Sequence, residues 1–337
     1  MLRAMQIDLR SIRHAVALAE HGSFSRAAEA LGIGQPTLSR SIRDLESQVG
    51  RTLFSRSRQG VKPTDFGYLV LKQGALVAGQ MQDLEREVAL AKGLHKGELA
   101  VGFGPYPFNL LLPLALPRFI TTQPAVRLRV QVDSLEVLGQ GLRKRALDVV
   151  IGERSILEAD EALEVFDSLP PLKAYLFARA GHPLANRKAE LREVLRYPLV
   201  QISRLPPRAL RPFLEARSRA GTNDDRPVPA IECPTVEAGI AAIVGSDALM
   251  MATLGMMRGE LVARRVIPIL REDWMATNWS FMRLRHRSPS PAAESLLALL
   301  RSAHQQRTKE DAVLERRWAT PVAREASLAK RRAGPKR

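Results

Sequence analysis

The residues best suited to recognising another molecule lie close together near the N-terminus. From Gln35 to Ser47, hydroxyl, amide and guanidinium side chains recur at helical spacing, and Arg40 and Arg43 are the cations among them. Guanidinium groups read guanine edges or clamp phosphates, and hydroxyl and amide groups reach phosphates or bases. This face predicts contact with nucleic acid. Periodicity alone leaves open an ordinary amphipathic helix with a solvated polar face.

The elements that must position this face are short helices separated by tight turns. Asp8 is the expected N-cap of a first helix, which His21-Gly22 ends, and Ser23 or Ser25 can begin a second. Pro36 fits the first turn of a third helix, where backbone N–H groups lack intrahelical partners. Two small helices joined at a short glycine-containing turn predict a helix-turn-helix whose second helix enters the major groove. The buried face of that helix is expected to consist of Leu38, Ile42, Leu45 and Val49.

Two short extended segments then flank Gln59-Gly60, as in a β-hairpin. Arg56, Arg58 and Lys62 would give this wing cationic tips suited to phosphate or minor-groove contact. A solvated surface hairpin is the alternative.

The pattern from about residue 9 to 67 resembles the N-terminal signature of the LysR family of bacterial transcriptional regulators. The matching runs begin at Gly22-Ser23-Phe24-Ser25-Arg26 and at Gln35-Pro36-Thr37-Leu38-Ser39-Arg40, and the chain departs from many relatives at Asp65-Phe66. The resemblance implies that Gln35, Thr37, Ser39, Arg40 and Arg43 face the operator and that Arg56 contacts its backbone. The predicted DNA-binding set is Ser23, Arg26, Gln35, Pro36, Thr37, Ser39, Arg40, Arg43, Arg56, Arg58 and Lys62.

A long helix is expected from Thr64 to about Lys92, with apolar residues spaced alternately by four and three. Gly74 weakens its centre by about 1 kcal/mol relative to alanine. The helix could pack on its own domain, but its length favours a partner helix. The family resemblance implies an antiparallel helix pair that forms a homodimer, and a tetramer as a dimer of dimers. The predicted dimerisation residues are Val70, Val77, Met81, Leu84 and Val88.

From Glu98 onward, expected strands and helices alternate, which predicts βαβ units and a mostly parallel sheet. The expected fold class is multidomain α/β: an all-α winged helix-turn-helix, a long linker helix, and a two-lobed α/β domain. The two-lobed part resembles the effector domain of the same family, which is itself similar to periplasmic solute-binding proteins. A strand is expected at Val228-Pro229-Ala230-Ile231. The expected divisions are 1–67 for the DNA-binding domain, 68–97 for the linker helix and hinge, 98–304 for the regulatory domain, with lobe I at about 98–170 and 265–304 and lobe II at about 171–264, and 305–337 for a basic, disordered tail.

A cleft between two such lobes is where open α/β sheets bind ligands. Helix starts at 105–109 and 235–237 offer unpaired N–H groups to an anion. However, two prolines and two aromatic residues in the first of these turns favour a less polar or aromatic effector. A cleft that senses nothing is the alternative. The predicted effector-binding residues are Gly104, Pro105, Tyr106, Phe108, Ser134, Ile202, Ser203, Thr235 and Val236.

Composition agrees with this interpretation. The net charge of +16 favours a polyanionic partner, and the excess lies at both ends of the chain. The lone Cys233 fits a reducing compartment and is interpreted as a structural thiol rather than a redox switch. We expect a cytoplasmic location, no membrane partner, no cofactor, no metal site and no catalytic residue, since the six histidines show no metal-ligand spacing.

The leading hypothesis is a transcriptional regulator that binds double-stranded DNA, responds to a small molecule and can contact RNA polymerase. A DNA-binding architectural regulator without an effector is the second hypothesis. An enzyme built on the two-lobed domain is the third, and the absence of a nucleophile–base constellation counts against it.

Overall fold

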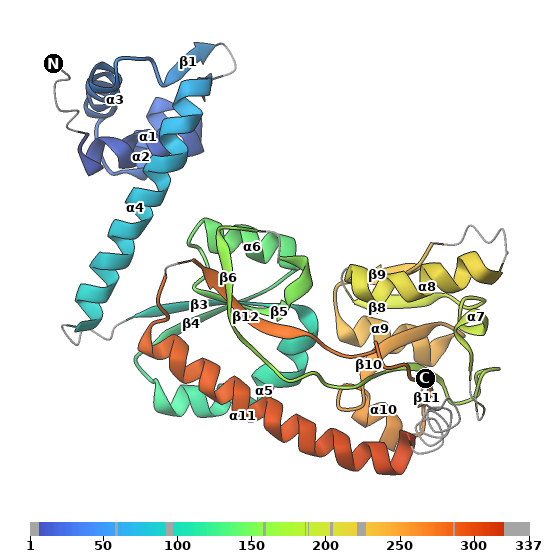
Figure 1. Ribbon diagram of the computed structural model, residues 1–337. Coiled ribbons are helices and arrows are strands. Elements are labelled where there is room, and N and C mark those ends of the chain that lie inside the picture. The colour runs from blue at the N-terminus through green and yellow to red at the C-terminus, as the bar shows by residue number, and fades with distance from the viewer. Residues whose placement is uncertain are drawn as a thin grey trace, which may run out of the picture. The chain divides into compact units, whose positions relative to one another are not determined.

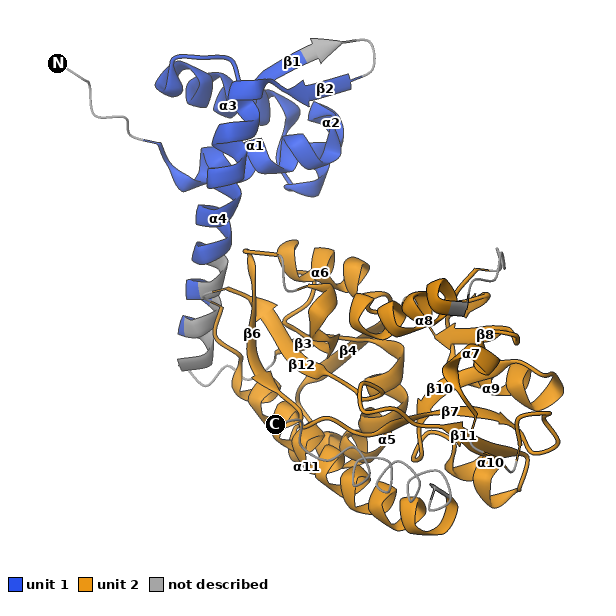
Figure 2. Ribbon diagram, turned by 45° about the vertical axis from the view of Figure 1, so that its right-hand side comes forward, with its two compact units in different colours: residues 1–95 blue, residues 96–337 orange. Residues whose placement is uncertain are grey.

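The computed structural model divides into two compact units, Met1–His95 and Lys96–Arg337, which Figure 2 shows in separate colours. The described residues are 7–57, 60–91, 97–157, 160–185, 187, 189–202, 205–220, 227–285 and 287–319.

The first unit begins with three helices, α1 (Leu9–His21), α2 (Phe24–Ala30) and α3 (Gln35–Val49) (Figure 1). The carboxylate of Asp8 caps α1 by accepting a hydrogen bond from the amide of Ser11 at 2.9 Å. Gly22 ends α1 in the left-handed region, at φ 60°, which glycine adopts without steric cost. Leu18 and Leu38 lie fully buried in the core that the helices share. The predicted helix-turn-helix is therefore present.

The predicted hairpin consists of two antiparallel strands, β1 (Phe54–Ser57) and β2 (Gly60–Pro63). The carboxylate of Glu46 on α3 accepts a hydrogen bond from the amide of Leu53 at 2.7 Å and so holds the start of the first strand. The amide of Val61 donates to the carbonyl of Gly22 at 3.0 Å and holds the second. The wing is thus held by α3 and by the residue that ends α1.

The hairpin leads into the long helix α4 (Asp65–Ala91). The hydroxyl of Thr64 caps it, as predicted, by accepting from the amide of Gly67 at 2.9 Å. A Cβ atom on Gly67 would overlap the backbone carbonyl just before β1, and one on Gly74 would lie 2.9 Å from Cγ2 of Ile12 on α1. Gly74 therefore lowers helix propensity but permits close packing of α4 on α1.

The second unit holds two five-stranded sheets. The lobe I sheet has the order β4-β3-β5-β12-β6, in which β12 runs antiparallel to both of its neighbours. Val101 and Phe103 of β3 pack toward α5 and α11, whereas Ala100 packs toward α6 on the opposite face. The elements are β3 (Glu98–Phe103), α5 (Pro105–Thr122), β4 (Arg127–Val132), α6 (Leu135–Arg143), β5 (Val149–Glu153), a 3-10 turn at Arg154–Ile156, β6 (Leu163–Ser168), β12 (Trp279–Leu284) and α11 (Pro291–Leu314).

The lobe II sheet has the order β11-β7-β10-β8-β9, with β7 antiparallel to β10 and β11. One face packs against α7 and α8, and the other against α9 and α10. The elements are β7 (Ala174–Arg179), α7 (Leu191–Val194), β8 (Leu199–Ile202), α8 (Pro207–Ala220), β9 (Ile231–Cys233), α9 (Val236–Gly245), β10 (Leu249–Thr253), α10 (Arg258–Val262) and β11 (Val266–Leu270).

Two crossing segments join the lobes, at residues 169–173 and 271–278. Two hydrogen bonds join the crossing segments: the amide of Leu172 donates to Oγ1 of Thr277 at 2.9 Å, and the amide of Thr277 donates to the carbonyl of Leu172 at 2.9 Å. The expected return to lobe I at residue 265 was too early, because β11 pairs with β7 and remains in lobe II. The strand expected at 228–231 was also displaced, since pairing with β8 begins at Ile231.

The disordered basic tail predicted from residue 305 is wrong for its first part, because α11 continues to Leu314 and a π-helical turn reaches residue 319. Leu314 and Trp318 pack against the lobe II core, and Nζ of Lys173 pairs with Glu315 at 2.7 Å. These contacts hold the segment up to residue 319 in place, although its charge alone predicted a disordered tail. The remainder, 320–337, lies outside the described residues.

Candidate nucleic-acid interface and ligand pocket

The outer face of α3 carries the polar side chains that the sequence singled out. Leu38, Ile42 and Leu45 are buried and fix the rotation of the helix about its axis. As a result Gln35, Pro36, Thr37, Arg40 and Arg43 are exposed, whereas Ser39 is half-buried.

Local hydrogen bonds hold part of this face in place. Nε of Arg43 donates to the carbonyl of Ser39 at 3.3 Å, and the hydroxyl of Ser25 donates to Oε1 of Gln35 at 3.4 Å. Arg26 is exposed on α2, and Ser23 is a half-buried N-cap without a side-chain capping bond. An exposed helix with guanidinium, amide and hydroxyl groups has the chemistry needed to read base edges and bind phosphates.

His14 supports α3 from behind. Its Nδ1 lies 2.8 Å from the hydroxyl of Ser41, and burial lowers the pKa of the imidazole. The ring therefore belongs to the structural support of the helix. In the wing, Lys62 is exposed on β2. Arg58 lies outside the described residues, as does the side chain of Arg56.

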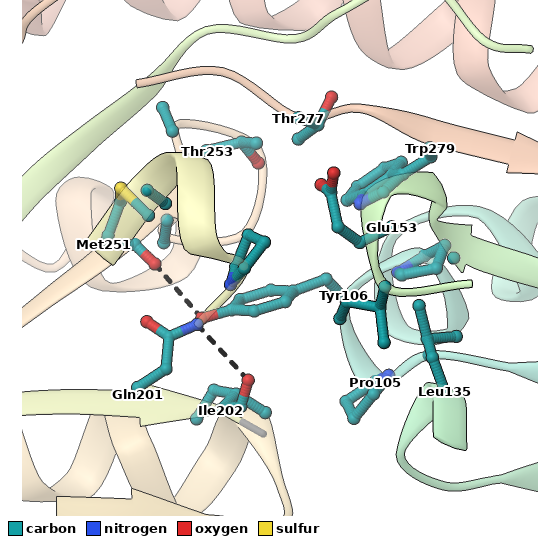
Figure 3. A pocket seen from close by; sticks show the side chains of 18 of the residues that line it. Pro105, Tyr106, Leu135, Glu153, Gln201, Ile202, Met251, Thr253, Thr277 and Trp279 are labelled. Atoms are coloured by element: carbon teal, nitrogen blue, oxygen red, sulfur yellow. Dashed lines mark hydrogen bonds between the residues drawn. The ribbon is translucent and has the colours of Figure 1, made fainter. Parts of the chain in front are cut away.

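The second unit contains a cavity between its two lobes, of about 850 Å³ including the space at its open mouth. Lobe I contributes the start of α5, the start of α6 and the end of β5, and lobe II contributes β8, β10 and the start of α8. The apolar part of the wall includes Ile156, Met251, Met256, Trp274 and Trp279. Figure 3 shows Tyr106 extending from the α5 side toward Gln201 and Met251.

Five of the predicted effector-binding residues line this cavity: Gly104, Pro105, Tyr106, Ser134 and Ile202. Phe108 instead packs against Phe103 in the lobe I core, with ring centroids 6.2 Å apart. Thr235 caps α9 and Val236 is buried in the lobe II core, so neither belongs to the cavity wall. Ser203 lies outside the described residues.

A charged pair that the sequence did not reveal crosses the cavity. Nη2 of Arg208 on α8 lies 2.8 Å from Oε2 of Glu153 on β5, and Nε lies 3.1 Å from Oε1. Nη2 also donates to the carbonyl of Ala276 in the second crossing segment at 2.8 Å. The residues are 55 positions apart, and no local motif links them. Arg208, on lobe II, thereby contacts both lobe I and the second crossing segment.

Tyr106 is the second contact across the cavity. Its hydroxyl donates to the carbonyl of Met251 at 3.2 Å. Burial raises the pKa of the phenol, so it stays protonated and remains a donor near neutral pH. The amide nitrogen of the neighbouring Gln201 donates to the carbonyl of Ile202 at 3.3 Å. Aromatic and amide groups thus meet where β8 and β10 line the cavity.

Cys233 lies at the end of β9, beside this site. Burial raises the pKa of its thiol, and Sγ lies 3.8 Å from the carbonyl of Gln201. A raised pKa reduces the thiolate fraction, which supports the structural interpretation over a redox role.

Within the described part of the chain, no three His, Cys, Asp or Glu side chains are grouped so that they could hold a metal ion. Among the same residues, no helix combines the length and apolar character required to span a lipid bilayer.

The two units are a winged helix-turn-helix, extended by the long helix α4, and a two-lobed α/β domain. Residues 9–68 match the family model described as "Bacterial regulatory helix-turn-helix protein, lysR family", and residues 92–305 match "LysR substrate binding domain". The chain therefore belongs to the LysR family and is a DNA-binding transcriptional regulator.

Two curated relatives extend over nearly the whole chain. The "SDS degradation transcriptional activation protein" of a Pseudomonas species is 35% identical over 304 residues, which are 87% of this chain and 95% of that protein. The regulator CfxR of Cupriavidus necator is 30% identical over 304 residues, 89% of this chain and 92% of that protein.

Solved structures confirm the fold. A full-length OxyR variant from Pseudomonas aeruginosa has a TM-score of 0.63 at 19% identity, covering 89% of this chain and 95% of that one. Full-length LysG from Corynebacterium glutamicum, solved with bound Arg, has a TM-score of 0.60 at 19% identity, covering 89% of this chain and 99% of that one.

Proposed function

We propose that the protein is an effector-responsive regulator that binds operator DNA as a homodimer. One observation carries this proposal: the chain that presents the exposed polar face of α3 also holds a cavity between two α/β lobes. Gln35, Thr37 and Arg40 would enter the major groove, and Lys62 of the wing would contact the backbone. A ligand that fits one arrangement of the lobes better than another would shift the population of DNA-binding states.

The long helix α4 supports the dimeric state. Leu71 and Ala78 face the core of the first unit, and Val70 is half-buried against it. Val77, Met81, Leu84 and Val88 are exposed on the same helix. Exposed apolar residues at this spacing fit a second helix. A symmetric dimer would read a roughly two-fold related DNA site.

The apolar cavity and one relative together favour a particular kind of effector. The Pseudomonas relative is named for the degradation of SDS, an amphiphile with a long alkyl chain. Methionine and tryptophan side chains in the cavity wall suit an alkyl or ring-bearing molecule of the same general type. An architectural regulator without an effector would have no use for such a cavity, so we favour the sensor.

Recovery of genomic DNA with the purified full-length protein, followed by sequencing, tests DNA recognition. We expect enrichment of a short two-fold related sequence, and recovery of random fragments at all salt concentrations would contradict the proposal. A thermal-shift screen of small organic compounds tests the sensor, because a ligand that binds only the folded state raises its stability. No shift with any apolar or amphiphilic compound would leave the architectural role.

A further inference from the structure

We propose that Tyr106 is a built-in occupant of the cleft: its phenol ring fills the space at β8 and β10 that part of a free ligand would otherwise take, and its hydroxyl joins lobe I to lobe II. The inference rests on the proposed sensor function and specifies how the effector site is shared between the chain and its ligand. Three observations carry it: the origin of the ring in lobe I, the partners of its hydroxyl in lobe II, and a second side-chain bridge across the same cavity.

The side chain of Tyr106 starts in lobe I and ends in lobe II. Tyr106 lies in the first turn of α5 between Pro105 and Pro107, which are both buried. Because proline fixes φ, the backbone on either side of Tyr106 has little conformational freedom. From there the ring packs against the core clusters of both lobes and lines the cavity between them (Figure 3).

Lobe II surrounds the phenol oxygen with polar groups. The hydroxyl donates to the carbonyl of Met251 at 3.2 Å, and Met251 directly follows the last residue of β10 that pairs with β8. The backbone amide of Ile202 and the side chain of Gln201 also act on this oxygen and favour its ionised form, yet burial outweighs them and raises the pKa of the phenol. Buried polar groups of this kind fix the orientation of a ligand, and Tyr106 already uses them.

The ion pair of Arg208 and Glu153 is a second bridge across the cavity, with Nη2 2.8 Å from Oε2. Both bridges are made by side chains of this chain, so the lobes are joined without a contribution from the effector. A cavity of about 850 Å³, including its open mouth, remains beside the ring. An effector therefore has to fit this remaining space against Tyr106, and it acts on the lobes by strengthening or weakening the two bridges.

Replacing the ring by a free molecule tests the inference on the full-length protein. 4-Methylphenol is the tyrosine side chain as a separate compound, and Tyr106→Ala vacates the space that it would fill. At about ten times its Kd for this variant, we expect it to raise the Tm of Tyr106→Ala by about 3–6 °C and that of the unmodified protein by less than about 1 °C. 4-Methylanisole, which has no O–H group to donate to the carbonyl of Met251, should give a smaller shift.

Phe119→Ala is the matched control, because it opens a space of similar size in the lobe I core among residues that do not line the cavity. We expect 4-methylphenol to leave the Tm of this control unchanged within about 1 °C. No stabilisation of Tyr106→Ala, or equal stabilisation of both variants, would overturn the inference.

A milder change keeps the inference testable if Tyr106→Ala does not fold. Tyr106→Phe keeps the ring and removes the hydroxyl that donates to Met251. Since this hydrogen bond joins the lobes, its loss should change the affinity for the recovered operator by at least about threefold. Tyr197→Phe, in lobe II outside the cavity wall, is the control and should change the affinity by less than about 1.5-fold. Equal affinity of Tyr106→Phe and the unmodified protein would contradict the bridge.

Thermal shifts also distinguish failure of this inference from failure of the sensor function. A screened compound that stabilises the unmodified protein, with no rescue of Tyr106→Ala by 4-methylphenol, would overturn the inference and leave the sensor function in place. Rescue of Tyr106→Ala, with no screened compound binding the unmodified protein, would contradict the sensor function alone.

Discussion

Arg208 and Glu153 face each other across the cleft and form a paired contact, with Nη2 to Oε2 at 2.8 Å and Nε to Oε1 at 3.1 Å. The exposed fractions of their side chains are 33% and 14%, so the pair is partly desolvated. It joins the end of β5 in lobe I to the first turn of α8 in lobe II, and both residues line the cavity.

The first prediction concerns this pair. Arg208→Gln should lower the free energy of unfolding by about 1–3 kcal/mol, because it leaves the carboxylate of Glu153 partly buried without its cation. Glu153→Gln combined with Arg208→Gln should cost less than the sum of the two single changes. Urea denaturation of the four proteins measures the coupling. Strict additivity would show that the pair adds nothing to stability.

The second prediction concerns DNA. Arg40→Ala should weaken operator binding by roughly 1–3 kcal/mol and relax specificity at one base pair, if the guanidinium reads a base. Lys72→Ala provides the control, because it removes an equal charge from an exposed position on α4. Binding titrations with wild-type and single-base-substituted operators distinguish the two variants. Unchanged affinity for Arg40→Ala would remove this residue from the interface.

The third prediction concerns oligomeric state. Val77 and Leu84 have exposed fractions of 53% and 52% in the monomer. Val77→Asp combined with Leu84→Asp should dissociate the dimer, since paired helices would bury four carboxylates in an apolar seam. Light scattering measures the mass, and Gln73→Asp on the same helix is the control. Persistence of a dimer in the double variant would show that the seam lies elsewhere.

The fourth prediction concerns pH. Burial raises the pKa of Asp311 on α11 to about 6, from an ordinary value of 3.8. The folded state therefore holds this proton more strongly than the unfolded state, and its contribution to stability is complete below pH 3.8 and is lost as the pH rises through about 6. Asp311→Asn should raise stability at pH 8 by about 1–3 kcal/mol.

The two proteins should converge in stability as the pH falls toward 4, and thermal unfolding across this range measures the difference. A constant offset between them at every pH would mean that Asp311 keeps an ordinary pKa in the folded state.

The sequence predicted the first unit well because its signals are local. Caps such as Asp8 and Thr64, the turn at Gly22 and the spacing of Leu38, Ile42 and Leu45 each depend on a few neighbouring residues. The two-lobed architecture followed from the alternation of strands and helices. Five cavity residues were predicted because they lie at strand ends or just after them, where ligands bind in such folds.

The remaining site residues depend on contacts between distant segments. Contacts between lobe II and lobe I determine the roles of Arg208, Gln201 and Met251. No residue spacing in the sequence predicts those contacts. The start of the helix at Thr235 predicted a position at the cleft, but the start of α9 packs on the core of its own lobe. The helix beyond residue 304 was missed because its charge outweighed the apolar signal of Leu314 and Trp318.

That helix has a mechanical consequence for the cleft. α11 begins on lobe I, where Leu296 and Leu300 are buried. In the turn that follows it, Glu315 accepts a hydrogen bond from the hydroxyl of Tyr175 on β7 of lobe II at 3.0 Å and also pairs with Lys173 of the first crossing segment. The helix and the turn that follows it therefore connect lobe I to lobe II rigidly. A wide swing of the lobes would have to bend α11 or pull Trp318 out of its packing, so the arrangements of the lobes between which a proposed ligand selects should differ only by small shifts.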